Sequence, residues 1–206
     1  MDVYSWDAGV AIGYFIWDGQ ENKAITDRID QLAINCYRFI NNRSLSCKNY
    51  VPANSYSEIE NKLGVFRSTF LAIIQHLTTG RFSLSPSIDM VKFTSLTTKL
   101  KDVDKKTAIK VLTRLESMML TKWDRLKSTC KLSKYHPRIE AKHEKTMEPK
   151  FRKRGDMLNY SSTIHLHNKV CECIFITTDK TDFGSLNLGS LGLPYKMPPI
   201  EFVQNY

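Results

Sequence analysis

Long hydrophobic runs are scarce in this chain of 206 residues, and their scarcity argues against a transmembrane helix. The most apolar stretch, residues 10–17, has eight residues, whereas a helix that spans a bilayer needs about 20. Residues 1–7 contain no basic segment followed by an apolar one. We therefore expect no secretory signal peptide.

Cysteine is also scarce, and its five positions are widely scattered. They are Cys36, Cys47, Cys130, Cys171 and Cys173. An odd number without regular spacing does not describe a disulfide framework. We expect free thiols and a reducing compartment.

The common catalytic signatures are missing as well. No Gly-x-Ser-x-Gly turn, which would present a nucleophilic serine, occurs in the chain. The glycine-rich residues 184–192 lack the Lys-Ser/Thr ending of a phosphate-binding loop. His136 and His143 lie in a polar basic segment that is a poor scaffold for catalytic geometry. We therefore expect no enzymatic activity, no catalytic residue and no cofactor.

Positive charge, in contrast, is abundant and unevenly distributed. The chain has 30 Lys and Arg against 21 Asp and Glu, a formal net charge of +9. Residues 99–154 hold 18 Lys and Arg against 7 Asp and Glu, a net charge of +11, whereas the remainder holds 12 against 14, a net charge of −2. Such an asymmetry favours an anionic partner, either a phospholipid surface or RNA and nucleoprotein. An ordinary solvated surface is the alternative.

The candidate anion-binding residues belong to one predicted helix and to the basic loop that follows it. They are Lys105, Lys106, Lys110, Arg114, Lys142, Lys145, Lys150, Phe151, Arg152, Lys153 and Arg154. Phe151, surrounded by cations, is suited to stacking on a base or to entering a membrane interface. The run from Lys150 to Arg154 also fits a nuclear import signal.

Apolar periodicity predicts three helices after an initial strand. Residues 10–17 form a short apolar run that is typical of a buried strand. Helical spacing follows over residues 25–40. Ser57 and Glu60 fit a capping box that begins a second helix, and a third helix begins near Asp104. The apolar residues of that helix recur at helical spacing as far as Leu126. Residues 91–100 favour neither helix nor strand.

A return to two-residue periodicity predicts a hairpin near the end of the chain. Residues 161–167 and 170–178 read as paired strands. The predicted fold is therefore α+β, one domain over residues 1–183 with a small antiparallel sheet and about three helices. A basic loop spans residues 133–156, and residues 184–206 form an extended tail rich in glycine and proline.

The predicted hairpin carries a possible zinc ligand set. His165 and His167 would share one face of a strand, as would Cys171 and Cys173. One-residue spacing within each pair strains a tetrahedral site, however. A hairpin with alternating, partly buried side chains explains the pattern better, so we expect no metal.

The predicted elements together resemble the matrix proteins of rhabdoviruses. The resemblance rests on the strand at 10–17, the helix at 25–40, the run Val65-Phe66-Arg67-Ser68-Thr69-Phe70-Leu71 and the late hairpin at 163–166 and 170–177. It implies a non-enzymatic structural adaptor that forms homo-oligomers, binds anionic membrane and ribonucleoprotein, and resides in the virion or peripherally at membranes of the host cytoplasm. Pro198-Pro199-Ile200-Glu201 lacks the tyrosine of the family's Pro-Pro-x-Tyr motif.

A second hypothesis follows from the charge alone. A basic surface beside aromatic residues also describes an RNA-binding module, such as a nucleocapsid component or a silencing suppressor. Salt-dependent binding to oligonucleotides rather than to anionic liposomes would distinguish this hypothesis from the matrix type.

Overall fold

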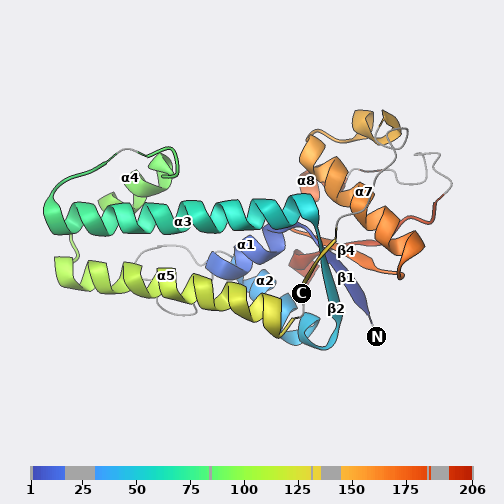
Figure 1. Cartoon of the computed structure of the whole chain (residues 1–206), viewed down its shortest axis with the longest axis horizontal. Coiled ribbons are helices and arrows are strands. Elements are labelled where there is room, and N and C mark those ends of the chain that lie inside the picture. Colours follow the sequence, from blue (N-terminus) through green and yellow to red (C-terminus); the bar gives the residue numbers. More distant parts are fainter. Residues whose placement is uncertain are drawn as a thin grey trace.

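The centre of the molecule is a five-stranded sheet in which every strand runs parallel to its neighbours (Figure 1). The computed structural model describes residues 2–16, 31–83, 85–130, 132–135, 145–184, 186 and 195–205. The strands, in chain order, are β1 (Val3–Trp6), β2 (Lys48–Pro52), β3 (Ser133–Tyr135), β4 (Ile174–Thr177) and β5 (Ile200–Phe202). Their spatial order is β3-β2-β1-β4-β5, which makes the fold a Rossmann-like α/β fold. The predicted α+β fold with an antiparallel sheet is wrong.

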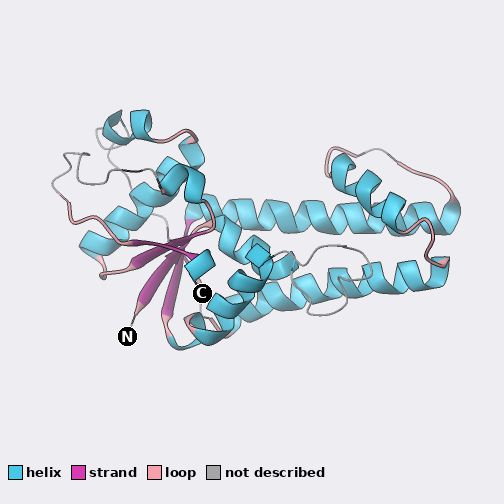
Figure 2. Ribbon diagram, turned by 180° about the vertical axis from the view of Figure 1, so that it is seen from behind, coloured by secondary structure: helices cyan, strands magenta, loops and turns pink. Residues whose placement is uncertain are grey.

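Helices connect the strands and form a long arm beside the sheet. They are α1 (Ala8–Ile16), α2 (Gln31–Asn42), α3 (Ala53–Thr79), α4 (Met90–Lys99), α5 (Lys105–Ser128), α7 (Arg154–Lys169) and α8 (Lys180–Phe183), with short 3₁₀ turns at Ser44–Ser46, Glu148–Lys150 and Val203–Asn205. Helices α3 and α5 extend well past the sheet as an antiparallel pair, with α4 at their outer end (Figures 1 and 2). No helix in the described segments combines the length and hydrophobicity that a membrane crossing requires.

The sheet separates two hydrophobic cores, as expected when helices cover both faces of parallel strands. On one face, Trp6 of β1 packs edge-on against Phe39 of α2, with ring centroids 5.9 Å apart. On the other face, Phe175 of β4 packs against Tyr160 of α7 at 5.4 Å and against Phe183 at 5.1 Å. Successive side chains of a strand point to opposite faces, so Phe175 and its neighbour Ile176 belong to different cores.

The strand predicted at residues 10–17 is instead part of helix α1, as far as the structure describes it. A short apolar run does not distinguish a buried strand from a buried helix. Helix α1 is apolar on nearly all sides because it packs against α2, α3, α5 and β4 together. Val10, Ala11 and Phe15 are all completely buried.

The predicted hairpin is also wrong, because its first strand lies within helix α7. Ser162 donates to the carbonyl of Leu158 at 2.8 Å, and Thr163 donates to that of Asn159 at 3.0 Å. These bonds to the preceding turn satisfy buried hydroxyl groups inside a helix. Residues 174–177 of the predicted second strand do form β4, which pairs in parallel with β1 and β5.

The amphipathic helices were predicted more accurately. Helix α5 begins after Asp104, whose side chain accepts a hydrogen bond from the Thr107 amide at 3.0 Å, and this prediction is confirmed. Helix α3 exists, but it begins four residues before the predicted capping box, and Ser57 donates to the Ala53 carbonyl instead. The second half of the helix predicted at 25–40 lies in α2, whereas residues 25–30 lie outside the described residues.

The predicted basic loop and tail contain regular structure at several points. Strand β3 and the start of α7 lie within residues 133–156, and Met147 is buried in the second core. Residues 136–144 lie outside the described part of the chain. The predicted tail supplies β5, which forms the edge of the sheet next to β4.

Close packing of α1 on α2 gives a testable prediction about the fold. A Cβ atom at Gly13 would lie 2.6 Å from the Cys36 Sγ and 3.2 Å from its Cβ. Cys36 is completely buried and has little room to move. Gly13→Ala is therefore expected to lower the free energy of unfolding by about 1–3 kcal/mol, measured by urea denaturation.

Gly64 provides the matched control for this substitution. It lies in α3, and a Cβ there would meet no heavy atom within 4 Å. Gly64→Ala is expected to raise stability by about 0.5–1 kcal/mol through helix propensity alone. A stabilising effect of both substitutions would contradict the close packing of α1 on α2.

Candidate active site

A group of acidic side chains gathers at the carboxyl ends of β1 and β4. The chain order of the strands reverses between these two neighbours, and ligands of open parallel sheets bind at such a switch point. The acidic cluster consists of Asp7, Glu58, Asp156, Asp179 and Asp182. Its members come from the end of β1, from α3, from the first turn of α7, and from the segment after β4 that leads into α8.

Asp7 is the most deeply placed member of the acidic cluster. It follows β1 directly, and its backbone amide donates to the Ile176 carbonyl of β4 at 2.8 Å. Its side chain is only 7% exposed and accepts hydrogen bonds from Asn159 at 3.2 Å and Thr177 at 3.1 Å. Burial disfavours the charged form and raises the pKa of Asp7 to about 6.

Gly9 keeps the first turn of α1 against the segment that follows β4. A Cβ atom at this position would lie 2.1 Å from the Thr178 hydroxyl. Glycine is therefore required for the close approach between α1 and this segment. That approach brings Asp7 toward the residues around Asp179.

Three further carboxylates surround the ammonium group of Lys153. Oxygen atoms of Asp156, Asp179 and Asp182 all lie within 4.8 Å of one another. The Lys153 Nζ lies 2.9 Å from Asp182, 3.3 Å from Asp179 and 3.7 Å from Asp156. Asp179 uses its Oδ1 to cap α8, which leaves its Oδ2 facing Lys153. Arg152 lies at 3.9 Å from Asp182.

The acidic cluster holds more negative charge than its basic neighbours offset. Burial and the nearby Asp7 charge raise the pKa of Asp156 to about 7, despite the presence of Lys153. The Asp156 Oδ2 is buried and has no hydrogen-bond partner among the described residues. The hydrogen bond from Lys153, in contrast, lowers the pKa of Asp182. A further cation would therefore be bound favourably here.

The chemistry of the acidic cluster fits a hard divalent cation. Its donors are all carboxylate oxygens, which Mg²⁺, Mn²⁺ and Ca²⁺ prefer. The Asp156 Oδ2 is buried without a hydrogen bond, and its contact is the Lys153 ammonium at 3.7 Å, so it could serve as a ligand. Within the described segments, no other set of three or more His, Cys, Asp or Glu side chains converges in this way.

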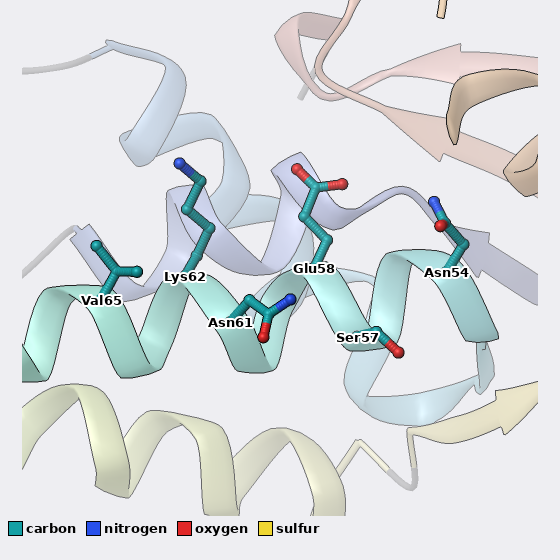
Figure 3. A pocket seen from close by; sticks show the side chains of 6 residues that line it. All are labelled: Asn54, Ser57, Glu58, Asn61, Lys62 and Val65. Carbon is teal, nitrogen blue, oxygen red and sulfur yellow. The ribbon is translucent and has the colours of Figure 1, made fainter. Parts of the chain in front are cut away.

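A groove opens beside the acidic cluster along helix α3 (Figure 3). Its volume is about 280 Å³, and it is lined by Asn54, Ser57, Glu58, Asn61, Lys62 and Val65. Asn54 donates to the Asn159 side chain at 3.2 Å, and Asn159 in turn donates to Asp7. Asn54, Glu58 and Lys62 rise from the same side of α3 on successive turns (Figure 3). The groove thus begins at the acidic cluster and continues outward along α3.

Two of the predicted residues of the basic loop, Arg152 and Lys153, contact the acidic cluster, and their role differs from the prediction. Lys153 and Arg152 face carboxylates rather than an external anion. Phe151 packs against Phe183 at 5.8 Å and Tyr160 at 6.2 Å, which places its ring against the second core. Lys145, Lys150 and Arg154 are exposed, and Lys142 lies outside the described residues.

The predicted residues of the third helix lie elsewhere, on the arm. Lys106, Lys110 and Arg114 are exposed on successive turns of α5, opposite its buried apolar face. Lys105 donates to the Thr78 carbonyl at 3.1 Å. The beginning of α5 lies at the outer end of the arm, far from α7 (Figure 1). The predicted basic residues therefore form two separate groups.

The histidines and cysteines considered for zinc do not converge. His165 and His167 lie two positions apart on a helix, so they point in different directions. The His165 Nδ1 bonds the Tyr135 hydroxyl at 2.6 Å, and the His167 Nδ1 accepts from the Cys173 amide at 3.0 Å. His167 and Cys173 line a hollow of about 370 Å³ at the amino ends of β1 and β4, away from the acidic cluster.

Sequence reasoning missed every member of the acidic cluster. A signal was nevertheless present, because Asp7 directly follows the mostly apolar β1 and Thr178-Asp179 directly follows the mostly apolar β4. Polar residues immediately after buried strands mark the functional edge of a parallel sheet. The prediction of an antiparallel hairpin concealed that signal.

Comparison with known proteins adds no relative from which a function could be transferred. No protein-family model matches the chain, and neither a curated protein nor a solved structure does.

Proposed function

We propose that this protein is a divalent-cation-dependent phosphodiesterase that hydrolyses nucleic acid. The observation that carries the proposal is the acidic cluster of five carboxylates at the switch point of a parallel sheet. The cluster belongs to a chain with a net charge of +9. A basic protein with a concentrated acidic site is suited to a polyanion and a cation together.

The cation and the carboxylates have distinct roles in this proposal. Asp156, Asp179 and Asp182 would hold the cation, which would displace the Lys153 ammonium from between them. Asp7 would add negative charge that acts on Asp156, and it fixes the inner wall of the site through Thr177 and Asn159. A bound divalent ion would neutralise phosphate charge and promote deprotonation of water. Without it, the acidic cluster would repel a phosphodiester.

The reaction is hydrolysis of one phosphorus–oxygen bond. Water forms a new bond to phosphorus, and the bond to the leaving sugar oxygen breaks. Glu58, which is exposed beside the groove, accepts the proton that the water loses. The leaving oxygen takes a proton from solvent, so the products are a phosphomonoester and a free hydroxyl group. This proposal departs from the expectation of a non-enzymatic protein.

The test is cleavage of end-labelled single-stranded RNA and DNA by the purified full-length chain. We expect shortened products in Mg²⁺ or Mn²⁺, no products in EDTA, and restored cleavage when the metal is added back. Asp156→Asn protein, purified in parallel, controls for contaminating nucleases and should be inactive. Equal cleavage by wild-type and Asp156→Asn protein, or no metal-dependent cleavage of either nucleic acid, would overturn the proposal.

RNA binding without hydrolysis is the second candidate function. The exposed row formed by Lys106, Lys110 and Arg114 on α5 favours it, because such a row can follow a phosphate backbone. Salt-sensitive RNA binding without cleavage in any metal would support this candidate.

The matrix-type function stays a prediction. Two of the elements on which the resemblance rested, at residues 10–16 and 163–166, lie in helices α1 and α7. Flotation with anionic and neutral liposomes tests it, and a preference for anionic liposomes together with self-association would support it.

A further inference from the structure

The groove beside the acidic cluster is lined by side chains of opposite charge on successive turns of α3. Asn54 lies at the inner end, where Asn159 links it to Asp7, and Glu58 and Lys62 follow on the next two turns (Figure 3). Four residues of a helix advance by about 6 Å. An anionic and a cationic position thus follow each other at a short interval along the same groove.

Lys92 of α4 adds a second cation near Lys62. Its Nζ lies 3.7 Å from the centroid of the Phe66 ring of α3. The charge of Lys62 and the partial burial of Lys92 both lower the pKa of Lys92, with burial as the larger cause, so the two ammonium groups act on each other. The Asp89 charge raises the pKa of Lys92, and this effect is larger than that of Lys62.

The position of Lys92 is fixed by the way α4 docks on α3. The Asp89 amide donates to the Thr69 hydroxyl of α3 at 3.0 Å, and the Asp89 Oδ1 caps α4 by accepting from the Lys92 amide at 3.0 Å. The Asp89 carboxylate is therefore engaged with backbone. Lys62 lines the groove, and the Lys92 ammonium lies over the ring of Phe66, one helical turn beyond Lys62, so the two cations together attract an anion to this part of α3.

We infer that Lys62 and Lys92 bind the phosphate adjacent to the one at the acidic cluster, so that the substrate is a strand of at least two linked nucleotides lying along α3. This inference rests on the proposed hydrolysis at the acidic cluster. It gives the groove a specificity role, because a small phosphodiester with one phosphate reaches the acidic cluster but not the lysines. A polynucleotide reaches both.

The experiment compares Lys62→Ala/Lys92→Met protein with wild type on two substrates in Mn²⁺. Methionine at position 92 keeps apolar contact with Phe66 while it removes the charge. For a labelled single-stranded oligonucleotide, we expect KM to rise about tenfold with little change in kcat, as for lost ground-state binding. For bis(4-nitrophenyl) phosphate, which has a single phosphate, we expect kcat/KM to stay within about twofold.

Binding in EDTA separates this inference from the proposed hydrolysis. Fluorescence anisotropy of the same oligonucleotide gives its binding constant at several salt concentrations. The slope of the logarithm of this constant against the logarithm of the salt concentration should be smaller in magnitude by about 0.7–1.4 in the double variant, because one or two phosphate contacts are lost. Lys169→Ala removes one exposed charge at the far end of α7 and should leave the slope unchanged. Urea denaturation confirms that each variant is folded.

Three results would overturn the inference. The first is that the double variant keeps the wild-type KM and salt slope for the oligonucleotide. The second is that its kcat/KM falls as much for the small phosphodiester as for the oligonucleotide, and the third is that Lys169→Ala lowers the salt slope as much as the double variant does. If wild type cleaves nothing, the proposed hydrolysis fails, and the anisotropy titration still decides whether the groove binds a strand.

Discussion

Asp7→Asn is expected to lower metal-dependent cleavage of an oligonucleotide about 1,000-fold or more, which is typical when a charged active-site group is lost. Asparagine keeps the shape of the side chain. Its oxygen can still accept from Asn159, and its amide can donate to the Thr177 hydroxyl, so the local structure should persist. The substitution removes the negative charge at the deepest point of the acidic cluster. Single-turnover kinetics in Mn²⁺ measure the effect.

Asp124→Asn is the matched control for this substitution. Asp124 is exposed on α5 and pairs with Lys127 at 2.8 Å, away from the acidic cluster. Its loss should leave cleavage unchanged within about twofold, since exposed ion pairs contribute little. Asp7→Asn protein that keeps most of its activity would remove the acidic cluster from the mechanism.

The elements that could be predicted from the sequence are those with one buried face and one solvent-exposed face. Helix α5 has one buried face and one solvated face, so its period is visible and its cap at Asp104 could be located. Helix α1 has almost no solvated face, and its period is therefore hidden. Helix α7 buries Ser162 and Thr163, whose polarity imitated the alternation of a strand.

Polar residues after the strands were visible in the sequence, but their convergence into the acidic cluster could not be predicted because strand order creates it. Asp7 and Asp179 are distant in sequence, and they approach each other because β4 inserts beside β1 rather than beside β3. The periodicity of apolar residues along the chain does not show which strands become neighbours in the sheet. The position of β4 also changes the role of a predicted basic residue, because Lys153 forms ion pairs with Asp179 and Asp182 instead of binding an external phosphate.

Metal binding and pH should be coupled through the two carboxyl groups whose pKa is raised. The folded-state pKa of Asp7 is about 6 and that of Asp156 about 7, both above the ordinary value of 3.8. A raised folded-state pKa favours folding while the group is protonated, and this contribution is fully present below pH 3.8 and is lost as pH rises from 3.8 to the folded-state pKa. For Asp7 the loss is on the order of 3 kcal/mol. Metal-free protein should therefore lose stability from about pH 4 to about pH 7.

A divalent cation should reverse that loss only where the carboxylates are ionised. Protons compete with the metal for the same oxygens. At pH 8, Mn²⁺ at about 100 times its Kd should stabilise the fold by about 2.7 kcal/mol, a rise in Tm of roughly 5–10 °C. At pH 5 the rise should be near zero. Differential scanning fluorimetry with Mn²⁺ and with EDTA, at both pH values, measures it.

Asp156→Asn makes this prediction specific to the acidic cluster. The variant lacks one of the titrating groups and one carboxylate oxygen of the cluster, so its Tm should fall less than that of wild type between pH 5 and pH 8 in EDTA. Its response to Mn²⁺ at pH 8 should be lost. An equal Mn²⁺ response at both pH values, or one retained in the variant, would mean that the metal binds elsewhere.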